Sequence, residues 1–145
     1  MIGLLQRVSR ASIEVDSRII AAIDTGLLVL IGVEKHDTPA RADRLLERLL
    51  GYRVFPDNAG KMNLSLTDIQ GGLLLVPQFT LPADTKKGMR PSFSSAASPI
   101  QGKELFSYLL ERATASHKYV QAGVFGTDMQ VHLTNDGPVT FWLQA

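Results

Sequence analysis

The sequence contains no cysteine, a single tryptophan and only three histidines. The absence of cysteine excludes a disulfide framework, a thiolate nucleophile and thiolate metal ligands. The histidines, His36, His117 and His132, are scattered and show none of the short spacings, such as His-Glu-x-x-His, that hold a metal ion. We therefore expect neither a metal site nor a cofactor.

Long apolar runs and a large charge of one sign are also missing. The longest apolar run, residues 27–33, is far shorter than the ~20 residues of a membrane-spanning helix. The first residues lack the pattern of a secretory signal, so we expect a cytoplasmic protein without a membrane partner. A net charge of +1 argues against coating long nucleic acid, yet a local basic patch could still grip one end of an RNA.

What is present is typical of one globular domain spanning residues 1–145, with 45% hydrophobic and 20% charged residues. Strands are expected at residues 2–8, 12–16, 18–23, 27–33, 73–76, 119–125, 128–134 and 139–144, with a hairpin between 53–55 and 61–64. Thr38-Pro39 and Ser98-Pro99 each supply an N-cap and a first helical proline, which predicts helices over 39–51 and 99–113. The predicted fold class is therefore α+β, with a largely antiparallel, barrel-like sheet and two main helices.

Conventional catalytic motifs are absent as well. The chain has no Gly-x-Ser-x-Gly elbow, no P-loop and no Gly-x-Gly-x-x-Gly segment. No histidine lies in a segment built around it, and His132, in an alternating strand, is interpreted as an exposed strand residue. Three other segments contain the candidate functional residues.

One candidate is the segment Asn-Asp-Gly-Pro-Val-Thr that begins at Asn135 and contains Gly137 and Pro138. Asp-Gly between two strands is typical of a tight hairpin turn. The fourth residue of such a turn normally donates the closing hydrogen bond, but Pro138 has no N–H. A plain hairpin is therefore disfavoured, and a cis peptide before Pro138 is permitted by the sequence without being predicted by it.

A second candidate is the strand end Pro77-Gln78-Phe79-Thr80-Leu81. Gln78 and Thr80 are two residues apart, so they point to one face of an extended chain. Pro77 has no N–H for the ladder, so strand pairing must be interrupted or at an edge there, which leaves backbone N–H groups free for a ligand. The alternative is that Gln78 is a surface residue and Thr80 an ordinary strand residue.

A third candidate is the long polar loop over residues 82–97, which contains Lys86, Lys87, Arg90 and Phe93. Long loops in compact domains are usually functional. Three cations beside an aromatic ring suit phosphate binding next to base stacking, although an isolated basic loop can also be merely solvated.

From end to end the chain resembles the D-aminoacyl-tRNA deacylases. The segments that carry the resemblance are IGLLQRVSRASIEV, GLLVLIGVEK, GYRVF, GKMNLSL, QFTL, KKGMRPSFS and NDGPVTFWLQ, in the family's order. The resemblance implies hydrolysis of the ester that joins a D-amino acid to the terminal adenosine of tRNA, with mischarged glycyl-tRNA also accepted. The implied partner is the aminoacylated tRNA 3′ end.

The resemblance also implies a homodimer with active sites at the subunit interface. Gly137 and Pro138 match a cis Gly-Pro pair that enters the partner's pocket, where its carbonyl groups reject L side chains. Arg7 is implied to orient this loop. Phe125 and Met129 are implied to wall the adenosine pocket, and a core role for Met129 is an equal alternative.

The family's Ser-Gln-Phe-Thr-Leu motif corresponds to Pro77, Gln78, Phe79, Thr80 and Leu81, so this chain departs from it at Pro77. Thr80 has no activating base in the sequence, which favours the family's substrate-assisted reaction through the ribose 2′-hydroxyl. The catalytic segment is then Gln78, Phe79 and Thr80, with the N–H groups of Phe79 and Thr80 stabilising the oxyanion.

Lys86, Lys87 and Arg90 are the candidates for acceptor-stem phosphates. Two other functions stay open: a module that binds tRNA ends but has lost turnover through Pro77, and a serine esterase acting on small esters.

Overall fold

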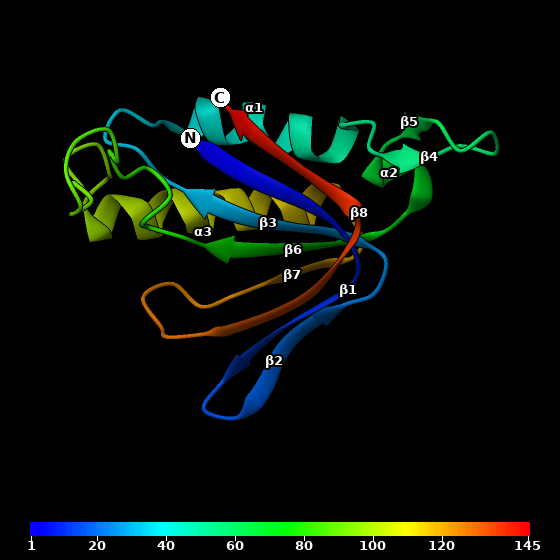
Figure 1. Cartoon of the computed structure of the whole chain (residues 1–145), viewed down its shortest axis with the longest axis horizontal. Helices are drawn as coiled ribbons and strands as arrows, with labels where there is room; N and C mark the ends of the chain where they lie inside the picture. Colours follow the sequence, from blue (N-terminus) through cyan, green and yellow to red (C-terminus); the bar gives the residue numbers. More distant parts are fainter.

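A strongly bent sheet lies against two long helices in the computed structural model, which describes residues 1–145 (Figure 1). The strands are β1 (Ile2–Val15), β2 (Arg18–Ile23), β3 (Gly26–Gly32), β4 (Phe55–Pro56), β5 (Met62–Leu64), β6 (Gly72–Pro77), β7 (Val120–Ala122) and β8 (Gln130–Gln144). The helices are α1 (Pro39–Gly51), α2 (Leu66–Ile69) and α3 (Pro99–Ser116). The strand order is β2-β1-β3-β6-β7 with β8 also paired to β1, while β4 and β5 form a separate hairpin.

The α+β class and the barrel-like sheet are confirmed. β1 pairs antiparallel with β2, β3 and β8, whereas β6 pairs parallel with β3 and β7. The parallel part was not predicted, because strand periodicity alone does not specify which strands pair.

Strands β1 and β8 are each longer than predicted. Residues 2–8 and 12–16 were expected as two strands, but β1 continues through Ser9 and Arg10, and Arg10 pairs with Thr134 of β8. The exposed polar side chains of Ser9 and Arg10 interrupt the apolar pattern, and the register with β8 shifts there, but the strand does not end. The sequence also failed to predict α2, a single turn capped by the reciprocal Ser65 and Asp68 pair.

Two hydrophobic clusters lie on the two faces of the central strands. The larger cluster fills the space between the sheet and the helices and includes Leu27, Val29 and Ile31 of β3. The smaller one lies inside the curl of the sheet and includes Leu28 of the same strand and Leu74 of β6. Strand β3 is therefore buried on both faces, as its continuous apolar run predicts.

Both long helices begin where predicted. The side chains of Thr38 and Ser98 accept hydrogen bonds from the backbone N–H groups three residues on. Asp43 on α1 joins the helices, accepting from the Tyr108 hydroxyl (2.9 Å) and the Arg112 Nε (3.0 Å). None of the helices is long and apolar enough to cross a membrane.

The two ends of the chain lie side by side at one edge of the sheet (Figure 1). The Met1 ammonium group is completely buried, donates to the Ala145 carbonyl at 2.9 Å and pairs with the buried Asp37 carboxylate. Asp37 also accepts the Glu34 N–H at 2.7 Å. This ion pair fixes the start of β1 against the loop that leads into α1.

Candidate active site

A cavity of about 520 Å³ opens where β3 and β6 end, which is within the usual size range of ligand sites. Its walls come from the ends of these strands, the first turns of α3 and the connection between β7 and β8. The lining includes Pro77, Gln78, Phe79, Phe125, Asp128 and Met129. Asp128 is the only ionisable residue in the lining, so the site offers little side-chain acid–base chemistry.

Gln78, Phe79 and Thr80 turn the chain away from the sheet at the mouth of this cavity. The Gln78 N–H makes the last bond to β3, to the Ile31 carbonyl at 2.8 Å, and the Leu81 N–H then closes a turn onto the Gln78 carbonyl at 3.2 Å. The N–H groups of Phe79 and Thr80 donate to no protein acceptor. Pro77 pairs with Ile31 of β3 and with no residue of β7, so it lies at an edge, as its missing N–H predicts. Two adjacent backbone donors are left free after Gln78.

The side chains of Gln78 and Thr80 lie on one face, as their spacing predicts. Gln78 Nε2 donates to Thr80 Oγ1 at 2.6 Å. An amide cannot take up the hydroxyl proton, so this contact orients Thr80 but does not activate it as a nucleophile.

A glycine in β3 sets the position of this turn. A Cβ atom at Gly32 would lie 2.9 Å from both Leu81 Cβ and Pro82 Cδ. Only glycine lets the turn pack directly against the end of the strand.

Phe125 and Met129 form the opposite wall. The Phe125 ring rests on Gly102 of α3, where an added Cβ would be 3.2 Å away, and it lies 6.5 Å from the Phe106 ring. Met129 lines the cavity and also packs against the smaller hydrophobic cluster. Met129 therefore lies in the cavity wall and against the core at once, and its contact with adenosine stays a prediction.

The Gly137–Pro138 pair lies in an outward excursion of β8. Gln6 pairs with Thr140 and Val8 with Asn135, so the single residue Arg7 faces the four residues 136–139. The Gly137–Pro138 peptide is cis and Gly137 has a φ of 148°, a region that favours glycine.

The Asn135 side chain closes the excursion in place of the bond that Pro138 cannot make. Its Oδ1 accepts the Val139 N–H at 2.7 Å, and its Nδ2 donates to the Val139 carbonyl at 3.3 Å and to Thr140 Oγ1 at 2.9 Å. This role of Asn135 was not predicted from the sequence, although Asn before a turn is well suited to bonding its own backbone.

Arg7 holds the excursion from the other side. Its Nε donates to the Asp136 carbonyl at 2.8 Å, and its Nη1 donates to the Val54 carbonyl at 2.7 Å. The Arg7 side chain is only 12% exposed. Arg7 therefore connects the Gly-Pro loop to the segment that enters β4.

Within one chain the Gly-Pro loop and the cavity lie at opposite ends of the sheet. Arg7 is level with Leu27, near the start of β3, whereas the cavity begins at Ile31. Four residues of strand span about 13 Å. Figure 1 shows the bend of β8 on one side and the turns that frame the cavity on the other. The structure thus does not bring Gly137 and Pro138 to Gln78, Phe79 and Thr80 of the same chain.

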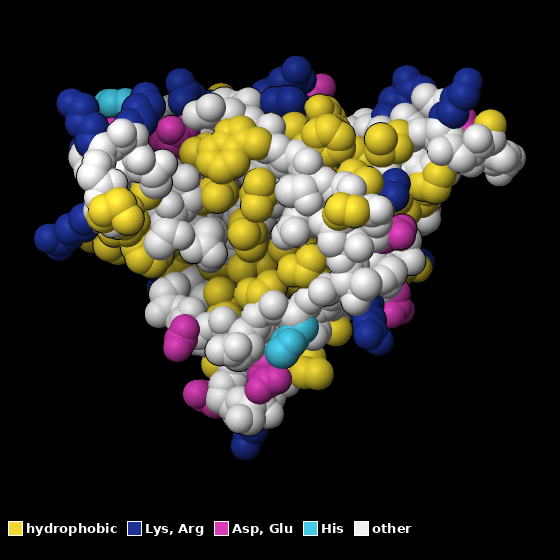
Figure 2. Space-filling model, in the orientation of Figure 1, with side chains coloured by type: hydrophobic (Ala, Val, Ile, Leu, Met, Phe, Trp, Pro, Cys, Tyr) yellow, Lys and Arg dark blue, Asp and Glu magenta, His cyan; other side chains and the backbone are white.

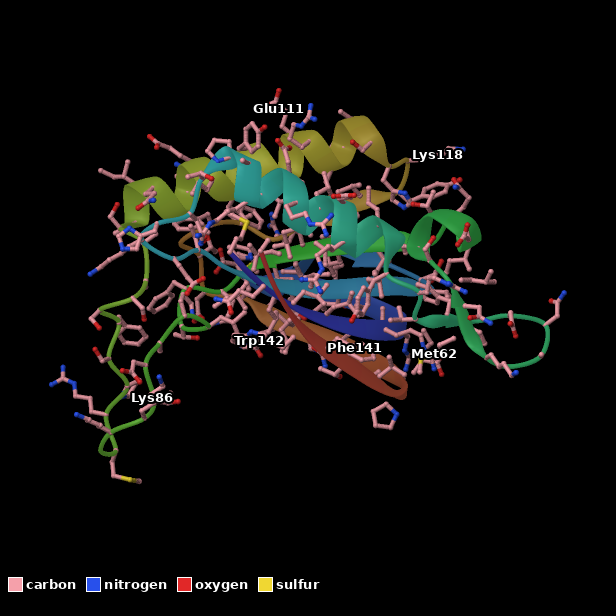
Figure 3. All side chains as sticks on the ribbon, turned by 90° about the horizontal axis from the view of Figure 1, so that it is seen from above. Met62, Lys86, Glu111, Lys118, Phe141 and Trp142 are labelled. Carbon is pink, nitrogen blue, oxygen red and sulfur yellow. The ribbon has the colours of Figure 1, made fainter.

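The basic part of the loop, residues 84–92, stands beside the cavity, and only the end of the loop, at Ala96 and Ala97, lines it. Reciprocal backbone bonds between Asp84 and Ser92, at 2.8 and 3.0 Å, close its base. Lys86, Lys87 and Arg90 are exposed beyond this point and form no ion pairs. Figure 3 shows Lys86 on a loop that projects from the body of the molecule.

Solved structures share this architecture. The chain superimposes with a TM-score of 0.96 and 37% identity on a protein described as "c-Myc DNA Unwinding Element Binding Protein", covering 100% of this chain and 99% of the other. It matches a probable eukaryotic D-amino acid tRNA deacylase with a TM-score of 0.86 at 17% identity, which shows a common fold.

Sequence relatives define the class as a hydrolase. Proteins named D-aminoacyl-tRNA deacylase from Pseudomonas fluorescens (strain Pf0-1) and Stutzerimonas stutzeri (strain A1501) are 64% and 63% identical, each aligned over all of both chains. The family model of D-Tyr-tRNA(Tyr) deacylase matches residues 4–144. The chain belongs to the D-Tyr-tRNA(Tyr) deacylase family.

Proposed function

We propose that this protein hydrolyses the ester between a D-amino acid, or glycine, and the terminal adenosine of tRNA. Family membership supports the reaction, and the observation that carries it to this site is the pair of free N–H groups at Phe79 and Thr80 beside a cavity. Adjacent donors with no protein partner are suited to a developing oxyanion.

In the proposed reaction, water adds to the ester carbonyl carbon and the bond to the ribose 3′-oxygen breaks. The ribose 2′-hydroxyl assists the attack, and the departing 3′-oxygen takes a proton that water released. The protein positions the ester and stabilises the charge that develops on its carbonyl oxygen. This limited role fits a cavity lining whose only ionisable residue is Asp128. Phe125 and Met129 would hold the adenine.

The oxyanion role of the backbone can be tested directly. Phe79 occupies the second position of a turn, where proline is accepted. Phe79→Pro and Phe79→Ala both remove the ring, but only the proline removes the N–H. We expect kcat for D-Tyr-tRNA to fall about 100-fold more in Phe79→Pro than in Phe79→Ala. Equal losses in the two folded variants would refute the role.

We further propose a homodimer in which Gly137 and Pro138 of one chain enter the cavity of its partner and reject L side chains. The separation of the loop from the cavity within one chain supports exchange between chains. So does the front of the molecule, where apolar side chains gather centrally and charged ones lie mostly around the edge (Figure 2). Leu133 and Trp142 are exposed on β8, and Trp142 points outward in Figure 3.

Mixed dimers test this arrangement. A Phe79→Pro homodimer is expected to hydrolyse D-Tyr-tRNA poorly, and a Pro138→Ala homodimer is expected to lose its rejection of L-Tyr-tRNA. If each site combines two chains, a hybrid dimer has one site with both an intact Phe79 and an intact partner Pro138, and that site should hydrolyse D-Tyr-tRNA selectively. Absence of selective hydrolysis in verified hybrids would contradict the proposal.

Pro77 supports a second candidate, a protein that binds tRNA ends without turnover. Its ring replaces the motif serine in the cavity wall. The rates at which the wild type and Pro77→Ser hydrolyse D-Tyr-tRNA and L-Tyr-tRNA distinguish the enzyme from the binding protein. Selective loss of the D ester with wild type supports the enzyme, whereas activity only in Pro77→Ser supports the binding module.

A further inference from the structure

Two aromatic rings meet at the mouth of the cavity and stay largely open to solvent. Phe79 is 65% exposed and Phe93 is 43% exposed, with their ring centres 5.4 Å apart and their planes inclined by 42°. Phe79 also lines the cavity, whereas Phe93 lies beyond it. The pair therefore extends the cavity outward as an apolar shelf.

Hydrogen bonds on both sides of Phe93 fix its place. Before it, Ser92 and Asp84 exchange backbone bonds, and after it the Ser95 hydroxyl donates to the Pro82 carbonyl at 2.5 Å. The Ala97 N–H then donates to the Val33 carbonyl at 3.0 Å. The ring is thus held by an ordered base of the loop and is not on its free tip.

The chain between the two rings is positively charged. It contains Lys86, Lys87 and Arg90 against one carboxylate, Asp84, which accepts the Lys86 N–H at 2.9 Å. Dark blue side chains fringe the edge of the molecule where Figure 1 places this loop (Figure 2). Exposed rings next to cations bind unpaired nucleotides, by base stacking and phosphate contact.

We propose that Phe79 and Phe93 form a stacking platform for the nucleobase immediately before the terminal adenosine, with the basic loop facing the phosphates upstream. This rests on the proposed function, since the adenosine is taken to occupy the cavity. The platform would let the protein select an RNA 3′ end over a free adenosine ester.

A pair of minimal substrates tests the platform. The D-tyrosyl esters of adenosine and of the dinucleotide CpA differ only by the nucleotide that the platform would bind. We expect the wild type to prefer the CpA ester by about tenfold in kcat/KM. Phe93→Leu should abolish that preference by lowering kcat/KM for the CpA ester about tenfold more than for the adenosine ester, and Phe93→Tyr should retain the preference.

Tyr119→Leu is the matched control, because Tyr119 is a 48% exposed aromatic residue at the opposite end of β6. Equal use of both esters by the wild type, or loss of the preference in Tyr119→Leu, would overturn the platform. So would dissociation of a dimer by Phe93→Leu, which would assign the rings to a contact between chains.

Binding of unesterified CpA against adenosine, measured by calorimetry, separates the two proposals. Tighter CpA binding that depends on Phe93 supports the platform even if no ester is hydrolysed. No hydrolysis of either ester would count against the proposed function alone, and equal affinities would count against the platform.

Discussion

Replacement of Asn135 by alanine should loosen the Gly-Pro loop and reduce stereochemical selectivity. The side chain makes three hydrogen bonds across the excursion, two to Val139 and one to Thr140. Pro138 has no N–H to replace them. The loop would then rely on Arg7 alone.

The size of the effect follows from these bonds. A neutral hydrogen bond contributes about 0.5–1.5 kcal/mol, and the half-buried position of Asn135 places each toward the lower end. We expect Asn135→Ala to lower the free energy of unfolding by about 1–2 kcal/mol. Thr140→Val removes one of the three bonds and should lower it by about 0.5 kcal/mol.

Selectivity should change more than stability if Asn135 positions the loop. We expect the ratio of kcat/KM for D-Tyr-tRNA to that for L-Tyr-tRNA to fall about tenfold in Asn135→Ala, equivalent to about 1.4 kcal/mol. Asn135→Asp keeps the acceptor for the Val139 N–H, so its D-to-L ratio of kcat/KM should lie between those of the wild type and Asn135→Ala. Asn58→Ala, on the exposed β4–β5 turn, is the matched control.

A double-mutant cycle between Asn135→Ala and Thr140→Val completes the test. Because one bond joins the two side chains directly, their effects on unfolding should be non-additive by about 0.5 kcal/mol or more. Strictly additive effects, with an unchanged D-to-L ratio in Asn135→Ala, would refute a positioning role.

Three other predictions follow from single contacts. Arg7→Lys should lose selectivity for D-Tyr-tRNA over L-Tyr-tRNA nearly as fully as Arg7→Ala, because one ammonium cannot reproduce the separate Nε and Nη1 bonds; a wild-type ratio of kcat/KM in the lysine variant would contradict this. Asp37→Asn should lower the melting temperature by about 10 °C, because it removes the buried carboxylate that pairs with the buried Met1 ammonium and leaves only the more distant, partly exposed Glu34 at 3.4 Å; calorimetry of the folded variant checks this. The Asn63 side-chain hydrogen bond, with backbone bonds, lowers the pKa of Asp57 below 3.8, so the stability it provides is present above about pH 4 and is lost as pH falls through the lowered value. Unfolding curves of the wild type and Asp57→Asn should therefore converge in acid, and a difference that grows on acidification would contradict the sign.

Much of the fold was predictable from local patterns. The capped starts of α1 and α3, the central place of β3 and the edge position of Pro77 all depend on neighbouring residues, whose propensities the sequence displays. The continuity of β1 and β8 was not predictable, because a strand can continue where exposed polar side chains interrupt the apolar pattern and the pairing register shifts.

Residue patterns alone indicate the family, the candidate segments and the need for another group to replace the missing N–H of Pro138. The folded chain is needed to see which group replaces it, which residues hold the loop, and where the loop lies relative to the cavity. Arg7 and Asp136 are 129 residues apart, and their contact exists because β1 and β8 pair. Contacts between residues so far apart in the sequence are set by strand pairing and packing, which no local pattern of residues encodes.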